Sequence, residues 1–437
     1  MRSELSGTDA AVRSARLALL AQFALFGVIG PSWLSRLPSI RESLGVSTGA
    51  LGALLVAGAA GALVTLLLAG AVVGRLGTRR TVVVATSGAL TGLGLVAAGT
   101  ALGSVPVFAV GALLNGASGA LVNVPINLDG ARVERRVGRT VLPHMHAAFS
   151  VGAALGALLG AVSSAAGVPV SLHVLVVAVL VATGRFATVR PATALDAGPS
   201  GGGRAARGAA RGAALAAWTE PRTLLIGVVL LASALAEGSA ANWLSLAVAT
   251  GLDQPEAVGA LAYGSFVTAM TVVRLTGTRL VDRLGRVVVL RASQLCALGG
   301  LLLFCLAPTL PLAWLGVLAW GVGAALPNPL AVAAAADEPE RAAARVAVAT
   351  SFSSFAQLTA PPLLGLLAEE VGVRPALLPL TVAIALGLLV AGRVRPIGPR
   401  ATPAHGPSGT AAEAADGGSA DARGDGVSES AQVTGPR

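Results

Sequence analysis

The sequence is poor in charged residues and has no lysine at all. Of its 437 residues, 12% are charged and 54% are hydrophobic, whereas about 25% of the residues in soluble globular domains are charged. This composition nearly excludes a water-soluble protein. The net charge of +10 comes from arginine alone, in short clusters between apolar runs, as in the cytoplasmic loops of membrane proteins. Nucleic-acid binding, which depends on phosphate contacts along a basic surface, is therefore disfavoured.

Cysteines and catalytic motifs are also scarce. The two cysteines, Cys296 and Cys305, lie in one apolar run, at a spacing that points them to opposite sides of a helix. They provide neither a disulfide framework nor a metal site, and we expect no metal and no cofactor. The sequence has no Gly-Lys-Ser or Gly-Lys-Thr phosphate loop and no His-Glu-x-x-His motif. It therefore predicts neither ATP-driven transport nor an enzyme.

Long apolar runs recur along the chain, each close to the roughly 20 residues that a membrane-spanning helix needs. They cover residues 15–33, 48–73, 81–101, 105–128, 142–164, 169–187, 223–247, 256–278, 287–307, 312–335, 346–368 and 374–392. We predict an all-α membrane protein with twelve transmembrane helices in two six-helix pseudo-repeats. The first run lacks a cleavage site, so it is expected to remain as a span rather than act as a signal peptide.

The positions of the arginines predict how the chain crosses the membrane. If both termini are cytoplasmic, only Arg36, Arg41 and Arg374 lie outside, and Arg274 is the one basic residue inside a span. We therefore predict cytoplasmic termini. Arg274 lies near the cytoplasmic end of its run, and we expect its side chain to reach the headgroups. An ion pair with Asp282 or with a substrate carboxylate is the alternative.

Shifts in composition divide the chain into four parts. We predict an N-terminal six-helix bundle at 1–190, a cytoplasmic linker at 191–221, a C-terminal six-helix bundle at 222–395 and a disordered cytoplasmic tail at 396–437. The linker is rich in Gly, Ala and Arg, and the tail is polar and acidic, so neither can bury a core.

Short motifs recur in the two halves. Trp33–Ser35 recurs as Trp243–Ser245 at an offset of 210, and Arg75–Gly77 recurs as Arg283–Gly285 at an offset of 208. Both recurrences agree with the six-plus-six pattern of apolar runs, which indicates a duplicated unit. Parallel repeats of this kind are typical of carriers whose halves rock about a central site.

One of these motifs resembles a known family. Gly70–Arg80 is similar to the loop pattern Gly-x-x-x-Asp-Arg-x-Gly-Arg-Arg of the major facilitator superfamily, with Gly74 where the family has Asp and with a further departure at Thr78. Asp282–Arg286 repeats the motif and keeps the acid. In that family the loop is a conformational latch, which the missing Asp would weaken here. The resemblance implies a latch formed by Gly70, Arg75, Gly77, Arg79, Asp282, Arg283, Gly285 and Arg286.

A narrower resemblance extends over most of the chain, up to about residue 395. Trp33–Arg41, His146–Ser150 and Glu237–Trp243 are similar to a poorly characterised bacterial branch close to the fucose-permease-like sugar porters. In the family, the first, fourth, seventh and tenth helices line the cavity. The resemblance therefore implies a group of amides near the substrate, namely Asn123, Asn127, Asn242 and Asn328. Hydrogen bonds between helices are the alternative role for these amides.

Glu237 is the one acidic residue that we predict in the middle of a span. A charge at that depth costs about 3 kcal/mol or more, so such residues usually face a cavity and serve function. We expect Glu237 to couple transport to protons or to contact a cationic or hydroxylated substrate. A structural hydrogen bond to Ser233, one turn earlier, is the alternative.

Two tryptophans and one histidine complete the candidate site. Trp33 and Trp243 lie near the outer ends of the first and seventh runs, where they can anchor the protein at the interface or stack on a sugar or aromatic ring. His146 begins the fifth run and can belong to a proton path or be a buried, hydrogen-bonded histidine. In the same run, Gly152, Gly156 and Gly160 have the spacing that lets another helix approach closely.

These observations predict a secondary transporter of a bacterial inner membrane. We expect a monomer that moves a small organic solute across the lipid bilayer by alternating access, coupled to protons. With aromatics at 3%, a compact polar solute fits better than a broad range of drugs. An uncoupled facilitator, in which Glu237 is structural, and a drug or metabolite exporter of the same fold are alternatives. An intramembrane enzyme is a further alternative, but the sequence shows no converging set of nucleophile, base and orienting residues, which such an enzyme needs.

Overall fold

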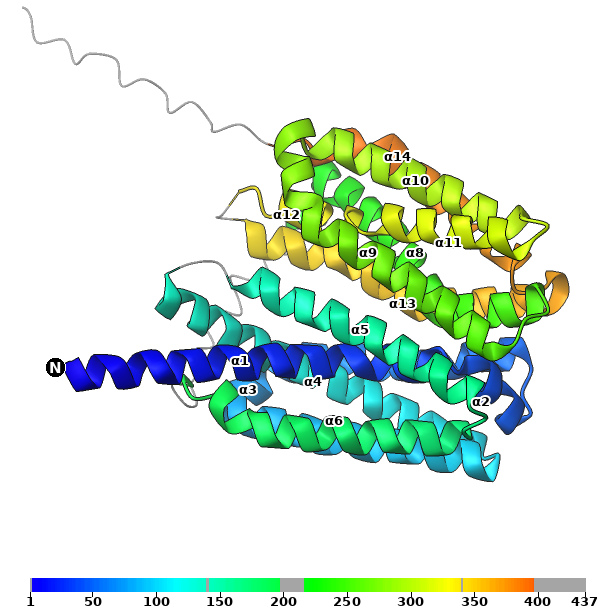
Figure 1. Cartoon of the computed structure of the whole chain (residues 1–437). Coiled ribbons are helices and arrows are strands. Elements are labelled where there is room, and N and C mark those ends of the chain that lie inside the picture. The colour runs from blue at the N-terminus through cyan, green and yellow to red at the C-terminus, as the bar shows by residue number, and fades with distance from the viewer. Residues whose placement is uncertain (1, 139–140, 197–215, 339–340, 397–437) are drawn as a thin grey trace, which may run out of the picture. The chain divides into compact units, whose positions relative to one another are not determined.

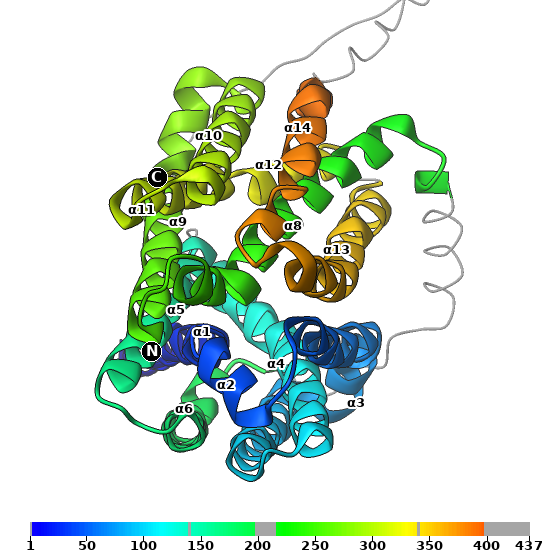
Figure 2. The same ribbon diagram turned by 90° about the vertical axis from the view of Figure 1, so that its right-hand side faces the viewer.

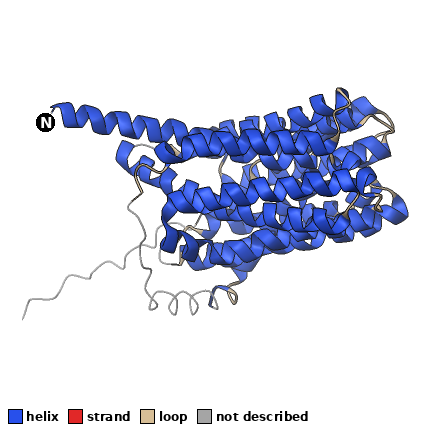
Figure 3. Cartoon of the chain, turned by 90° about the horizontal axis from the view of Figure 1, so that it is seen from below, coloured by secondary structure: helices blue, strands red, loops and turns tan. Residues whose placement is uncertain are grey.

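The apolar runs fold into long helices that lie side by side (Figure 1, Figure 3). The computed structural model describes residues 2–138, 141–196, 216–338 and 341–396, and these ranges contain helices and loops but no β-strand. The helices are α1 (Arg2–Leu34), α2 (Leu37–Leu44), α3 (Thr48–Leu102), α4 (Val105–Val137), α5 (Leu142–Ala165), α6 (Val170–Ala192), α8 (Pro221–Gly251), α9 (Glu256–Leu284), α10 (Arg286–Leu306), α11 (Leu310–Ala324), α12 (Pro327–Ala335), α13 (Ala342–Val371), η1 (Pro375–Leu377), α14 (Leu380–Val390) and η2 (Ala391–Val394).

The described helices have the length and composition of membrane spans. Ten segments among them are long and apolar enough to cross a bilayer, and many large apolar side chains point outward, as expected of helices surrounded by lipid. The prediction of an all-α membrane protein is confirmed. The 55-residue α3 counts as one of these ten segments, and α13 is not among them. If α3 crosses the membrane twice and α13 crosses it once, the same helices make twelve crossings.

The helix α3 contains a chain reversal at Gly77. Its backbone there has φ 77° and ψ 168°, which is not helical and which glycine adopts far more readily than other residues. On one side of the break Gly58 lies against the Ala112 carbonyl of α4, and on the other side Gly92 lies against the backbone of Asn115. Because both parts of α3 pack on the same stretch of α4, they form two crossings rather than one long rod.

Small residues bring α1 and α5 into close contact. A Cβ added at Gly152 would meet the Ala24 carbonyl of α1, and one added at Gly156 would meet the Val28 carbonyl. Gly160 lies against Ser35. The close helix approach predicted from this glycine spacing is confirmed.

Two groups of helices meet at one end of the molecule. The N-terminal half (α1–α6) and the C-terminal half (α8–η2) are seen in Figure 2 from the end that carries the turn between α1 and α2, which we call the Arg36 end. In this view α5 lies beside α9 and α3 beside α13. Gly52 of α3 packs on the Pro361 carbonyl of α13, and the Gly49 amide donates to Glu369 Oε1 at 2.9 Å.

The predicted division into four parts remains a prediction. The described residues belong to one compact unit. Residues 197–215, which make up most of the predicted linker, and residues 397–437 of the predicted tail lie outside the described residues.

Candidate functional site

An ion pair joins α8 and α9 within their membrane-spanning segments. Arg274 Nη2 lies 2.8 Å from Glu237 Oε1, and Arg274 Nε donates to the Ala325 carbonyl at 3.0 Å. That carbonyl is available because its usual helical donor, four residues on, is Pro329, which has no N–H. The break between α11 and α12 therefore provides an acceptor that orients the guanidinium toward Glu237.

The two side chains of this ion pair are partly buried. The Glu237 side chain is 25% exposed and the Arg274 side chain 29% exposed. An ion pair at this depth compensates two charges that would each be unfavourable alone. Both side chains keep part of their surface exposed.

This pair corrects two of the expectations from the sequence. Arg274 does not extend to the headgroups or pair with Asp282, and Asp282 is exposed. Glu237 accepts from Arg274 rather than bonding to Ser233, whose hydroxyl is buried without a hydrogen-bond partner among the described residues. The reason is that opposite charges in a medium of low dielectric constant attract strongly and find each other across helices. The signal for this pairing in the sequence is that Glu237 and Arg274 carry opposite charges inside neighbouring spans.

Two other titratable side chains lie within electrostatic range of the pair. Tyr263 of α9 is buried near Glu237. His146 of α5, in the other half, lies near Arg274. The His146 ring is exposed and packs edge-on against Phe23, with ring centroids 5.3 Å apart. The alternative role for His146, that of a buried, hydrogen-bonded histidine, does not agree with this exposure.

The four asparagines fall into two groups. Asn127 Nδ2 donates to Asn123 Oδ1 at 2.9 Å, so these two side chains share one face of α4 as predicted. Asn123 is exposed. Asn242 on α8 and Asn328 on α12 are half-buried, and within the described ranges no hydrogen bond joins either of them to Glu237. The predicted role of these amides at the substrate stays a prediction.

The two tryptophans lie inside the protein. Trp243 is fully buried, and Trp33 is buried edge-on against Phe108, with ring centroids 6.3 Å apart. The expectations that these rings anchor at the lipid interface or stack on a solute therefore do not agree with their positions in this conformation. Trp33 and Trp243 lie near the ends of α1 and α8 at the Arg36 end, where the neighbouring helices cover their apolar rings.

Two buried charges were missed in the sequence. Asp129 of α4 and Arg185 of α6 are each 1% exposed, so Glu237 and Arg274 are not the only charged residues within the bundle. Asp129 pairs with Arg132 in the next turn. Arg185 lies inside the apolar run 169–187, where a single charge among apolar residues is the signal in the sequence. Asp129 follows the fourth run by one residue, within the uncertainty of a run boundary.

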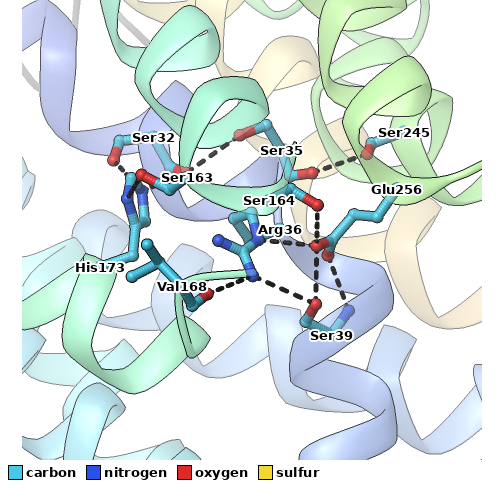
Figure 4. A network of polar contacts seen from close by, with 10 residues as sticks. All are labelled: Ser32, Ser35, Arg36, Ser39, Ser163, Ser164, Val168, His173, Ser245 and Glu256. Carbon is cyan, nitrogen blue, oxygen red and sulfur yellow. Dashed lines mark hydrogen bonds and ion pairs between the residues drawn. The ribbon is translucent and has the colours of Figure 1, made fainter. Parts of the chain in front are cut away.

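A second polar cluster lies at the Arg36 end and joins the two halves (Figure 4). Its centre is Glu256, the first residue of α9, whose carboxylate lies 2.7 Å from Arg36 Nε. The carboxylate also accepts from the Ser39 backbone N–H at 2.8 Å, from Ser39 Oγ at 2.7 Å and from Ser164 Oγ at 2.7 Å. We call Arg36, Ser39, Ser164 and Glu256 the Glu256 cluster.

The N-terminal half holds the Glu256 cluster in place through further contacts. Arg36 Nη2 donates to the Val168 carbonyl at 3.0 Å. Beside it, His173 of α6 bonds to Ser32 Oγ of α1 at 2.9 Å and to Ser163 Oγ of α5 at 2.8 Å (Figure 4). The side chains of Arg36 and Glu256 are only 4% and 13% exposed. This cluster could not be predicted from the sequence, because Glu256 falls at the edge of an apolar run.

The predicted latch residues lie at the other end of the helices. Gly77 has a positive φ, and the Thr78 backbone N–H donates to Asp196 Oδ2 at 2.9 Å. Arg132 Nη1 lies 3.1 Å from Asp196 Oδ1. Asp196 thus supplies a carboxylate near the reversal where Gly74 takes the place of the family's Asp. Gly70, Arg75 and Arg79 are exposed.

The C-terminal copy of the motif has a similar arrangement. Gly285 has φ 80° and ψ 154°, and Arg286 Nη1 lies 2.9 Å from Asp337 Oδ1. Arg222 Nη2 lies 2.7 Å from Asp337 Oδ2. Asp282 and Arg283 are exposed. Residues beside the two reversals thus contact carboxylates that follow later helices, Asp196 after α6 and Asp337 after α12, but the latch itself stays a prediction.

Comparisons with known proteins give the family of this chain. The family model described as Major Facilitator Superfamily matches residues 17–348 and 226–420. The uncharacterized transporter y4wD of Sinorhizobium fredii is 32% identical over 360 residues, which cover 81% of this chain and 91% of that protein.

Solved structures share the fold. The nucleoside transporter NupG aligns with a TM-score of 0.67 at 17% identity, over 88% of this chain and 98% of that one. The transporter FucP in the outward conformation aligns with a TM-score of 0.60 at 14% identity, over 87% of this chain and 99% of that one. At these identities the likeness concerns the fold. The resemblance found in the sequence is thus confirmed.

Proposed function

This chain belongs to the Major Facilitator Superfamily, and we propose that it is a proton-coupled transporter of a small hydroxylated solute. Its relatives are membrane transporters and not enzymes, so the chain is a multi-pass secondary transporter. The observation that carries the finer proposal is the partly accessible ion pair between Glu237 and Arg274. We further propose that it acts as a monomer in a bacterial inner membrane, with both termini cytoplasmic.

The pair can link a proton to a solute. While Glu237 is ionised, its charge and its hydrogen bond hold Arg274. When Glu237 takes up a proton, the attraction is lost and the guanidinium becomes free to donate to hydroxyl oxygens of a solute. In this proposal His146, which lies near Arg274 on the opposite half, relays the proton. Proton uptake and solute binding then stabilise the same arrangement, which is the basis of coupling.

The contacts between the halves support alternating access. Within the described ranges, every hydrogen bond between the two halves lies at the Arg36 end, at the Glu256 cluster, at Ser245 or at Glu369. This arrangement supports a conformation that is closed at the Arg36 end. With cytoplasmic termini, it is closed toward the outside. Rocking of the halves would break these contacts and open that end.

The choice of solute follows from the site and from the neighbours. Arg274 and the asparagine amides are donors suited to hydroxyl and carbonyl oxygens, and only 3% of the residues of the chain are aromatic. Proteins of the same fold include a fucose:proton symporter, a D-xylose-proton symporter and nucleoside transporters. A panel of L-fucose, D-xylose and uridine therefore covers the proposed class.

Proton coupling is tested in liposomes that contain purified protein and a pH-sensitive dye. We expect at least one solute of the panel to change the internal pH when it is added outside the wild-type liposomes. Glu237→Gln is expected to abolish this pH change while exchange of labelled for unlabelled solute continues. The reason is that a glutamine can fill the site but cannot carry the proton.

A matched control uses another carboxylate of the C-terminal half. Glu370 of α13 is exposed, and Glu370→Gln is expected to keep both the pH change and the exchange. Solute flux in the wild type without any pH change would identify an uncoupled facilitator instead. A pH change that persists in Glu237→Gln would remove Glu237 from the coupling.

A further inference from the structure

One arginine buried in the N-terminal half has no carboxylate partner among the residues that the structure describes. Arg185 of α6 is 1% exposed. Its Nε donates to Gln22 Oε1 at 3.2 Å, and its guanidinium carbon lies 5.7 Å from the centre of the Phe26 ring. Gln22 and Phe26 lie one turn apart on the same face of α1. Within the described residues, the polar and aromatic groups that contact this cation are therefore neutral.

The other buried arginines of the described residues are better compensated than Arg185. Arg36 pairs with Glu256 and Arg345 with Glu220, and Arg374 donates to three backbone carbonyls. In contrast, Arg185 forms no ion pair with any described residue. Its Nη2 is buried and has no hydrogen-bond partner in the part of the chain that the structure describes. An arginine in a protein does not give up its proton, and a buried charge without compensation is strongly unfavourable. The site therefore calls for a negative charge.

A small cavity lies next to this arginine. It is lined by Arg185 and Thr86 and otherwise by apolar side chains of α1, α3 and α6, and its volume is about 10 Å³. This is room for about one particle of the size of water. Thr86 provides a hydroxyl, which donates to the Val82 carbonyl at 2.7 Å and can turn toward a ligand. The cavity has no carboxylate in its lining.

We propose that this cavity binds a monatomic anion, with chloride as the physiological ligand, between Arg185 and Thr86. The small volume excludes carboxylates, phosphate and sulfate. A halide ion is somewhat larger than water, so its binding requires a slight movement of the apolar side chains that line the cavity. A water molecule brings no charge to compensate the guanidinium. The anion completes the packing of α6 on α1 and on the second part of α3.

The site is separate from the proposed transport chemistry. Arg185, Thr86 and Gln22 all belong to the N-terminal half, whereas Glu237 and Arg274 belong to the C-terminal half. The proposed function gives no role to Arg185, Thr86 or Gln22, so the presence of the anion does not rest on it.

The proposal is tested by the thermal stability of the purified protein in different salts. The melting temperature is compared in sodium chloride, sodium bromide and sodium gluconate at equal ionic strength. Because a ligand stabilises the folded state that binds it, we expect the melting temperature to be about 3 °C higher in both halides than in gluconate, which is too large for the cavity.

Two substitutions on α6 locate the effect. Arg185→Gln is expected to remove the difference between halide and gluconate. Arg190→Gln changes an exposed arginine of the same helix and is expected to keep the difference. Crystals of the wild type grown in bromide are expected to show an anomalous peak beside Arg185 and Thr86.

Each other outcome overturns the proposal. Equal melting temperatures of the wild type in the three salts would show that the cavity holds water only. A halide effect that persists in Arg185→Gln would place the anion elsewhere. If Arg185→Gln does not fold, Thr86→Val is expected to weaken the halide effect. In that case the bromide peak in the wild type decides, and its absence beside Arg185 rejects the site.

Discussion

Ser245 Oγ donates a hydrogen bond of 2.7 Å to the backbone carbonyl of Ser35. These two serines end the same Trp-Leu-Ser tripeptide in the two halves of the chain, and both are buried. The duplicated segments therefore meet at the Arg36 end. The residue after Ser35 is Arg36, which pairs with Glu256, so the Glu256 cluster lies where the repeats touch.

Removal of one partner of the Arg36–Glu256 pair is expected to open this end. In Glu256→Gln the buried guanidinium keeps its charge without a partner, which destabilises the closed conformation by about 3–5 kcal/mol. Spin labels at Leu102 and Leu306, exposed at the ends of α3 and α10, report the separation of the halves in a background without native cysteines. Pulsed electron paramagnetic resonance should show longer distances in Glu256→Gln and in Arg36→Gln.

The double variant separates the effect of charge from that of packing. Arg36→Gln combined with Glu256→Gln leaves no unpaired charge, so its distances should lie closer to those of the wild type than either single variant. Glu370→Gln, which changes an exposed carboxylate, should leave the distances unchanged. A double variant as open as the singles would argue against the unpaired charge as the cause.

The two glycines at the chain reversals are expected to tolerate no side chain. Gly77 and Gly285 have φ of 77° and 80° with ψ of 168° and 154°, a region almost restricted to glycine. Alanine at either position should lower the stability by about 1–3 kcal/mol. Among the described atoms, a Cβ at Gly285 would meet nothing within 4 Å. The loss of stability in Gly285→Ala is therefore due to the backbone conformation alone. Melting temperatures in detergent measure both effects.

Gly70 provides the matched control for these two substitutions. It belongs to the same predicted latch, lies inside α3 and has open space around its Cβ position. Because alanine favours a helix over glycine by about 1 kcal/mol, Gly70→Ala should keep or raise the melting temperature. An unchanged melting temperature in Gly285→Ala would contradict the positive φ at that residue.

The acid before α8 is expected to make stability depend on pH. Glu220 accepts hydrogen bonds from Arg345, at 2.6 Å and 3.2 Å, and these hold its pKa below the ordinary value. Since the pKa is lower in the folded state, the stabilisation is present above the unfolded value of about 4.3 and is lost as pH falls through the folded value. Glu220→Gln should lower the melting temperature at pH 7 and reduce the difference between pH 7 and pH 4.

An exposed glutamate serves as the comparison for Glu220. Glu42 of α2 is exposed, and Glu42→Gln should leave the pH dependence of the melting temperature close to that of the wild type. If Glu220→Gln retains the full pH dependence, the ion pair between Glu220 and Arg345 does not contribute to it.

Features that depend on short or periodic patterns could be predicted from the sequence. The glycine spacing of α5 predicted its close packing on α1, since Gly152 and Gly156 lie one turn apart on any helix. The shared face of Asn123 and Asn127 follows from the same periodicity. The partner of Glu237 could not be found in this way, because Arg274 lies on another helix and only the rotation of both helices determines whether they meet.

By itself the sequence determined the membrane class, the all-helical fold and the family, because hydropathy, small-residue spacing and loop motifs are properties of neighbouring residues. The tertiary structure alone decided which charges meet. It joined Glu237 to Arg274 and Arg36 to Glu256, and it left Arg185 with neutral partners. These choices depend on how helices rotate and pack against one another, and the free energy of a buried charge depends on the groups that this packing brings within a few ångströms.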